Sequence, residues 1–239
     1  MLILGLNKTT LLDYPEHVAA TIFTGGCNFR CPFCHNRELV FARESIDAGL
    51  ITPYSEEEIL SFLRKRRGIL TGVCVTGGEP TLQPDLPAFL SRIKDLGLLV
   101  KLDTNGFRPD ILHRLLDDKL IDYCAIDIKN SPDKYARTIG LPTVDFSPLR
   151  ESVDCLLSLT GIFPYEFRTT VVKELHSSED MYAIREWIAN AAAYYLQSYT
   201  DSEQVITQGY HAHDAQTLLH FADICRETIP SVQLRGVEL

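Results

Sequence analysis

Residues 27–34 read Cys27-Asn28-Phe29-Arg30-Cys31-Pro32-Phe33-Cys34, a C-x3-C-x2-C run that directly follows an apolar segment. Three thiolates within eight residues can hold three corners of a cubane iron–sulfur cluster and leave its fourth iron open for chemistry. Zinc commonly takes four protein ligands, and a fourth from the adjacent His35 would crowd all of them onto one short loop. Three unrelated buried cysteines are the remaining alternative. The spacing favours one open 4Fe-4S cluster bound by Cys27, Cys31 and Cys34.

The chain of 239 residues is long enough for one large α/β domain, and no linker or low-complexity stretch divides it. We therefore expect a single domain over residues 1–239. A formal charge of -9 argues against a nucleic-acid partner and against an anionic membrane surface. No apolar run reaches membrane-spanning length, and the first residues lack the pattern of a signal peptide. With three of seven cysteines in one loop, a disulfide framework is not expected, and the chain reads as cytoplasmic.

Short β-branched runs alternate with helix-like segments, which is the pattern of a parallel sheet covered by helices. The expected strands are residues 18–23, 72–76, 98–103, 123–127, 166–172 and 193–197, with a further edge strand at 231–234. The expected helices are residues 55–66, 86–96, 109–118, 148–159, 178–191 and 215–227. Six strand–helix units are too few for the closed eight-fold barrel. The sequence therefore predicts an α/β protein with an open, partial (β/α)6 barrel.

Unusual residues follow the expected strands, at the ends where parallel α/β folds bind ligands. Gly77 and Gly78 would let a ligand approach the backbone, or would simply form a strand-to-helix turn. Glu79 could receive an ammonium group, or could be a solvated charge or a residue that starts a helix. Asp103 and Asp127 end neighbouring strands, so they could share a cation or could each cap the following turn.

Two basic residues complete this set. Lys129 closely follows Asp127, and Arg168 stands in an otherwise apolar and threonine-rich strand. They could neutralise a ligand carboxylate, or they could form salt bridges with the same aspartates, and the sequence does not decide between these roles. Chemistry-bearing residues after five strands predict one site at one edge of the sheet.

The remaining cysteines and two spaced histidines give weaker signals. The isolated cysteines are Cys74, Cys124, Cys155 and Cys225. Because none of them belongs to a second cysteine run, only one cluster is expected. His211 and His213 have a spacing that suits a metal, but a polar loop is the expected role.

The cysteine run, with Phe33 before its last cysteine, resembles that of the radical S-adenosylmethionine enzymes, as do residues 76–80, 103–106 and 127–129. Within that group, the Cys34-His35-Asn36 continuation and residues 103–106 are similar to the glycyl-radical-enzyme activating enzymes. Residues 6–15 and 23–32 are most similar to the anaerobic ribonucleoside-triphosphate reductase activating proteins. The similarity runs from the N-terminus to about Val172.

The resemblance implies a 4Fe-4S cluster whose open iron binds S-adenosylmethionine. One electron would cleave this cofactor to methionine and a 5′-deoxyadenosyl radical, which would abstract a hydrogen from a glycine of a partner enzyme. The expected partner is an anaerobic ribonucleotide reductase, and flavodoxin or ferredoxin would supply the electron. The alternatives are activation of another glycyl-radical enzyme of the pyruvate formate-lyase type, radical chemistry on a small molecule, and a non-enzymatic metal-binding module.

The resemblance also implies roles for residues at matching positions. Phe33 and His35 would lie near the adenine of the cofactor. The turn after the second expected strand would receive the methionine ammonium group through Gly77, Gly78 and Glu79.

Further matching positions concern the carboxylate of the cofactor. Three of them would hold a monovalent cation: Asp103, Thr104 and Asp127. Two basic positions would contact the cofactor or lie close to it: Lys129 and Arg168. One position departs from the family pattern, because Thr200 stands where the pyruvate formate-lyase activators have a cofactor-binding histidine. Either Gln197 or Thr200 would take over that role, or the ribose of the cofactor would be held differently.

Overall fold

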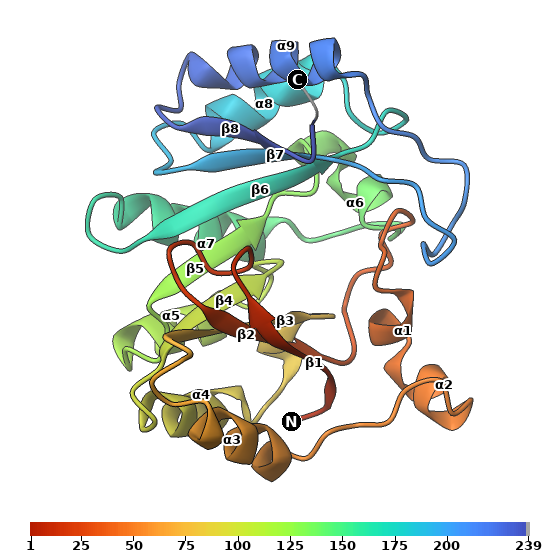
Figure 1. Ribbon diagram of the computed structural model, residues 1–239. Helices are drawn as coiled ribbons and strands as arrows, with labels where there is room; N and C mark the ends of the chain where they lie inside the picture. Colours follow the sequence, from red (N-terminus) through yellow and green to blue (C-terminus); the bar gives the residue numbers. More distant parts are fainter. Residues whose placement is uncertain (238–239) are drawn as a thin grey trace. The chain divides into compact units, whose positions relative to one another are not determined.

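The computed structural model describes residues 1–237 (Figure 1). The chain forms two compact units. The first contains Met1–Asn28, Asn36–Thr104 and Arg108–Cys124, and the second contains Phe29–His35, Asn105–Phe107 and the chain from Ala125 onward. The division passes through the cysteine run, so that Cys27 lies in the first unit and Cys31 and Cys34 lie in the second.

The first unit is built on strands in the order β1-β2-β3-β4. Their bounds are β1 (Ile3–Thr10), β2 (Ala19–Thr24), β3 (Gly72–Gly77) and β4 (Leu99–Thr104). β1 is antiparallel to β2, whereas the other neighbours are parallel. β1 was not predicted, because its residues 7–9 are exposed and give the segment no apolar alternation. Helices α3 (Glu56–Lys65), α4 (Leu86–Lys94) and α5 (Pro109–Asp117) follow β2, β3 and β4, and the short α1 (Arg37–Val40) and α2 (Ala42–Asp47) precede α3.

Local chemistry fixes where α3 begins. The Ser55 hydroxyl accepts a hydrogen bond from the Glu58 amide at 3.2 Å, and the Glu58 carboxylate accepts one from the Ser55 amide at 2.8 Å. This capping box satisfies two amides that the first helical turn leaves without partners. Ile59, Leu60 and Leu63 then form the buried side of the helix.

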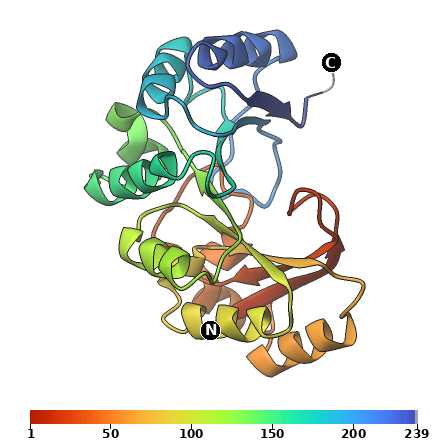
Figure 2. The ribbon, with the colours of Figure 1, turned by 90° about the vertical axis from the view of Figure 1, so that its left-hand side faces the viewer.

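The second unit contains β6 (Tyr165–Val171), β7 (Tyr194–Ser198) and β8 (Val232–Arg235), which are parallel neighbours in that order. β5 (Tyr123–Asp127) begins in the first unit and ends in the second. The helices of the second unit are α6 (Tyr135–Thr138), α7 (Ser147–Ser158), α8 (Ser178–Trp187) and α9 (Ala215–Arg226). α8 and α9 lie side by side, and α9 packs against β7 and β8 (Figures 1 and 2).

The α/β class predicted from the sequence is confirmed. Within residues 1–237, each of the six strands from β2 to β7 is followed by a helix, which gives the strand–helix units of a (β/α)6 fold. The predicted edge strand is present as β8. Among the helices of this part of the chain, none has the length and apolar character needed to cross a membrane.

Candidate functional site

Two glycines after β3 lie against the turn that follows β2. The Gly78 amide donates to the carbonyl of Thr24, and the Glu79 amide donates to that of Gly26, each at 2.8 Å. A Cβ on Gly78 would lie 2.0 Å from the Gly26 oxygen, and one on Gly77, whose φ is +124°, would lie 2.3 Å from the Thr24 nitrogen. Only glycine fits at these positions. The close approach fixes the backbone immediately before Cys27.

Glu79 is buried, with an exposed fraction of 1%. Its Oε1 accepts hydrogen bonds from the Thr81 amide at 3.0 Å, the Thr81 hydroxyl at 2.5 Å and the Thr104 hydroxyl at 2.6 Å. The alternative of a solvated charge is therefore wrong, and the alternative of a residue that starts a helix is confirmed by its bond to the Thr81 amide. Thr104, predicted beside a cation, donates to this carboxylate.

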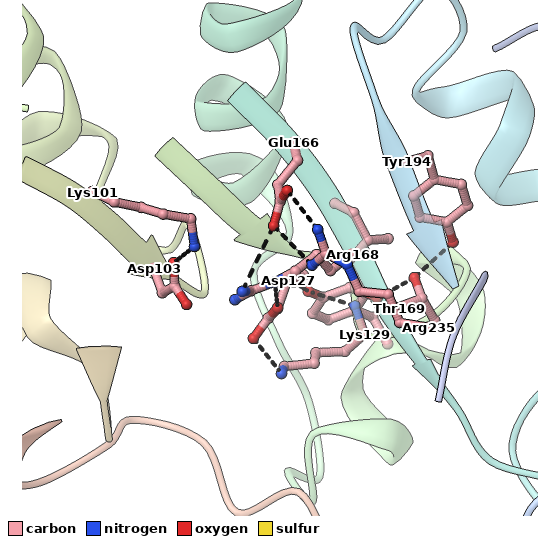
Figure 3. A network of polar contacts seen from close by, with 11 residues as sticks. Lys101, Asp103, Asp127, Lys129, Glu166, Arg168, Thr169, Tyr194 and Arg235 are labelled. Atoms are coloured by element: carbon pink, nitrogen blue, oxygen red, sulfur yellow. Dashed lines mark hydrogen bonds and ion pairs between the residues drawn. The ribbon is translucent and has the colours of Figure 1, made fainter. Parts of the chain in front are cut away.

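Asp103 forms an ion pair with Lys101, which lies two residues earlier on the same face of β4 (Figure 3). The Lys101 side chain is buried, with an exposed fraction of 2%, and its ammonium group lies 5.7 Å from the centre of the Tyr123 ring. The sequence analysis did not single out Lys101. An i, i+2 pair of opposite charge at the end of a strand was the available signal.

In the second unit, Asp127 bridges the two predicted basic residues (Figure 3). Its Oδ1 lies 2.9 Å from Nε of Arg168, and its Oδ2 lies 3.0 Å from Nζ of Lys129. Burial alone would raise the pKa of Asp127, but the two cations outweigh it and hold that pKa well below its usual range. The structure therefore shows the salt-bridge alternative for Lys129 and Arg168.

This ion-pair network extends to residues that the sequence analysis missed. Glu166 is buried and lies 3.8 Å from Nη1 of Arg168. Its carboxylate also receives both terminal nitrogens of Arg235, at 3.2 and 3.1 Å. The Arg235 guanidinium lies 3.5 Å from the centre of the Tyr195 ring. Three cations thus share two carboxylates, and each acid lies between two of the bases.

The cysteine loop of the second unit lies close to this network. Cys31 is buried, and its carbonyl accepts a hydrogen bond from the Cys34 amide at 3.0 Å. Burial disfavours the charged form of Lys129, but Asp127 and the Cys31 thiolate outweigh it and raise the pKa of Lys129. Cysteine thiolates are the groups that bind the iron of such clusters. The donor chemistry of this loop therefore fits a cluster ligand.

Two buried side chains fix the backbone of Lys129. The Tyr135 hydroxyl accepts from the Lys129 amide at 3.3 Å, and His176 Nε2 donates to the Lys129 carbonyl at 2.9 Å. The other ring nitrogen of His176 accepts from the Val172 amide at 3.0 Å, which requires a neutral imidazole. Burial lowers the pKa of His176, in agreement with that form. Both residues act through the backbone, so no motif in the sequence marks them.

The structure places the other predicted residues as follows. Phe33 is buried and His35 is exposed, both in the second unit. Asp103 and Asp127 belong to different units, so the predicted shared cation stays a prediction. Within residues 1–237, no three His, Cys, Asp or Glu side chains are grouped so that they could hold a metal ion. None of the seven cysteines forms a disulfide in this part of the chain.

The parallel α/β fold carries a three-cysteine loop after its first parallel strand, and cysteine thiolates are the ligands of proteins that bind iron–sulfur clusters. Residues 21–174 match the Radical SAM superfamily, and the chain belongs to that superfamily. The cofactors of the superfamily are a 4Fe-4S cluster and S-adenosylmethionine, the pair predicted from the sequence.

Similar proteins from archaea include more than one activity. A protein of Methanocaldococcus jannaschii named "Putative glycyl-radical enzyme activating enzyme MJ1227" is 32% identical over 205 residues, covering 83% of this chain and 80% of that protein. The 7-carboxy-7-deazaguanine synthase of Thermococcus kodakarensis is 32% identical over 123 residues, covering 46% of this chain and 48% of the synthase.

Solved structures share the fold. SuiB of Streptococcus suis bound to S-adenosylmethionine superposes with a TM-score of 0.66 at 16% identity, over 89% of this chain and 49% of SuiB. The chain therefore spans about half the length of SuiB. QueE from Escherichia coli superposes with a TM-score of 0.55 at 14% identity, over 98% of this chain and 93% of QueE.

Proposed function

We propose that this radical S-adenosylmethionine enzyme activates a partner enzyme by generating a glycyl radical on it, and that the partner is an anaerobic ribonucleoside-triphosphate reductase. The observation that carries the proposal is the similarity to the M. jannaschii protein, which extends over most of both chains. The resemblance of residues 6–15 and 23–32 to the reductase activators supports this choice of partner.

In this proposal Cys27, Cys31 and Cys34 hold the cluster. The bound cluster and S-adenosylmethionine supply the one-electron cleavage that produces the 5′-deoxyadenosyl radical. Lys129, which lies near Cys31, is placed to attract the carboxylate of the cofactor. Because Asp127 already pairs with Lys129 and Arg168, an arriving carboxylate shares these cations with Asp127 instead of meeting them unpaired. The two cations keep the added negative charge from remaining uncompensated in a partly buried site.

The remaining contacts belong to the same proposal. Glu79, held by Thr81 and Thr104, receives the ammonium group of the cofactor beside Gly77 and Gly78. Phe33 and His35 lie near its adenine. A monovalent cation at Asp103, Thr104 and Asp127, an electron donor of the flavodoxin or ferredoxin kind, a single functional domain and a cytoplasmic location complete the proposal.

A second candidate is radical chemistry on a small molecule. It is favoured by the similarity to 7-carboxy-7-deazaguanine synthase and to a T. kodakarensis protein named "Probable GTP 3',8-cyclase", which is 30% identical over 65% of this chain. These matches cover about half of each enzyme, 48% in both cases, whereas the match to the activating enzyme covers 80% of that protein. The more complete match favours the activating function.

The test uses reconstituted, reduced enzyme with S-adenosylmethionine and an anaerobic ribonucleotide reductase under anaerobic conditions. We expect a glycyl-type doublet in the electron paramagnetic resonance spectrum of the reductase. A reductase whose radical-bearing glycine is replaced by alanine is the control and should give no doublet. If the cofactor is cleaved while neither this reductase nor another glycyl-radical enzyme acquires the signal, the activating function is wrong and a small-molecule substrate is favoured.

A further inference from the structure

The connection between β7 and α9, residues 199–214, contains no helix or strand. Irregular connections of this length are uncommon in compact domains and usually have a function. This one is packed, because Tyr199 and Val205 each have an exposed fraction of 2%. It therefore has a defined conformation that can position other residues.

Residues 199–207 of this connection contact the cysteine loop within the second unit. The Thr207 amide donates to the Pro32 carbonyl at 2.8 Å. The Tyr199 ring stacks on the His35 ring, with centres 5.4 Å apart, and His35 Nε2 lies 2.5 Å from the Thr200 carbonyl oxygen. Pro32 directly follows Cys31, and His35 directly follows Cys34. Each of the last two cysteines of the run is therefore next to a residue that the connection contacts.

The second half of the connection is anchored to the turn after β6. The His211 amide and Nδ1 donate to the Glu174 carboxylate at 2.9 and 2.7 Å, and the His211 carbonyl accepts from the Lys173 amide at 2.9 Å. His213 Nε2 donates to the His176 carbonyl at 3.1 Å. His211 and His213, whose spacing suits a metal, therefore fasten this loop to the protein.

These anchors give the cysteine loop a support that its own sequence lacks. The loop has no helix or strand, so it must lose conformational entropy when its thiolates gather around one cluster. Contacts that restrict the loop before the cluster binds reduce that cost. The anchor at His213 also reaches the site, because His176 holds the Lys129 carbonyl.

We propose that residues 199–214 form a strap that holds Cys31 and Cys34 in the conformation that binds the cluster, with Tyr199 and Thr207 as positioning residues. The inference depends on the proposed cluster site and not on the proposed partner. Tyr199 acts through its ring on His35, and Thr207 acts through its amide on Pro32. The strap should therefore control how firmly the cluster is held.

Two matched pairs of variants test the strap in the reconstituted holoenzyme. Tyr199→Leu removes the stacking ring and Tyr199→Phe keeps it, whereas Thr207→Pro removes the amide donor and Thr207→Ala keeps it. The measured quantity is the rate of iron transfer to an excess of chelator under anaerobic conditions. A contact of about 1 kcal/mol corresponds to about a fivefold change in rate. We therefore expect iron transfer to be about fivefold faster in Tyr199→Leu and in Thr207→Pro. In the matched controls, Tyr199→Phe and Thr207→Ala, the rate should change by less than about twofold.

Hydrogen exchange separates a positioning role from a general loss of stability. In the Tyr199→Leu enzyme, the amides of residues 31–35 should exchange faster while those of β6 and β7 keep the exchange rates of the parent. Iron release and loop exchange that are equal in all four variants and the parent would overturn the proposal. If Thr207→Pro does not fold, the comparison of Tyr199→Leu with Tyr199→Phe tests the proposal by the same two measurements. A parent protein that takes up stoichiometric zinc and no iron would instead contradict the cluster site, and neither result involves the partner enzyme.

Discussion

Asp127→Asn should destabilise the second unit strongly, because it removes the carboxylate that Lys129 and Arg168 share. Asparagine keeps the shape of the side chain but leaves two neighbouring cations without that counter-ion. Loss of one partner of a buried ion pair costs about 3–5 kcal/mol. The Asp127 side chain is 30% exposed, so solvent screens part of the loss. We therefore expect a cost of about 2–3 kcal/mol.

Urea unfolding of the metal-free, reduced protein at pH 7 measures this cost. Trp187 is the only tryptophan of the chain and lies in the second unit, so its fluorescence reports on the unit that contains Asp127. With a slope of about 3 kcal/mol per molar urea, the midpoint should fall by about 0.7–1 M. Asp133→Asn, which changes an exposed aspartate of the same unit, is the control and should leave the midpoint unchanged.

A double-mutant cycle tests whether the loss comes from the ion pair itself. In a Lys129→Met background, Asp127→Asn should cost about 1–2 kcal/mol less than it does in the parent, because one of the abandoned cations is already absent. An unchanged midpoint for Asp127→Asn, or equal costs in both backgrounds, would refute the role assigned to Asp127.

Three further predictions concern the supports of the site. Gly78→Ala should cost at least about 2 kcal/mol, because its Cβ would lie 2.0 Å from a backbone oxygen, whereas Gly97→Ala, with nothing within 4 Å, should cost only about 1 kcal/mol of backbone strain; chemical denaturation compares them. The pKa of buried His176 is lowered from 6.5, so the contribution of its neutral form to the free energy of unfolding is fully present above pH 6.5. Below that pH the free energy of unfolding should fall by up to about 1.4 kcal/mol per pH unit. His176→Gln should lack this pH dependence when unfolding is measured between about pH 7.5 and 5.5. Thr104→Val removes a hydroxyl that donates to buried Glu79 and should cost about 1–3 kcal/mol in urea unfolding, and Thr104→Ser should recover most of it, whereas equal midpoints would show that this bond is unimportant.

The sequence predicts the part of the fold that has a periodic apolar signal. The strands from β2 to β8 and the helices α3, α4, α5, α7, α8 and α9 agree with their predicted positions within a few residues. The four elements without that signal were missed: β1, α1, α2 and α6. The middle of β1, residues 7–9, is exposed, and no apolar alternation runs along the strand, so its sequence gives no strand signal.

Site residues could be predicted only where functional side chains lie close together in the sequence. The cysteine spacing and the residues after each strand are local signals. The choice between a ligand contact and a salt bridge for Lys129 depends on its distance from Asp127, which no spacing gives. Glu166 and Arg235 meet across 69 residues of sequence. Long-range ion pairs of this kind leave no pattern in a single sequence.

Residues that act through the backbone are also invisible in the sequence. Tyr135 and His176 hold the amide and the carbonyl of Lys129, and Thr207 holds a carbonyl of the cysteine loop. The side-chain type at such positions is set by space and burial, and the backbone amide of Thr207 would be the same for most residue types. The tertiary fold alone assigns these roles.

Transfer of deuterium from the partner enzyme tests the central claim most directly. An anaerobic ribonucleotide reductase is produced in cells supplied with glycine that is deuterated at Cα. The labelled reductase is incubated anaerobically with the reduced enzyme and S-adenosylmethionine, and the 5′-deoxyadenosine formed is isolated for mass spectrometry. We predict that the product gains one mass unit from the labelled reductase and none from a reductase whose radical-bearing glycine is replaced by alanine. Unlabelled 5′-deoxyadenosine formed with the deuterated reductase would contradict the proposal that this glycine is the substrate.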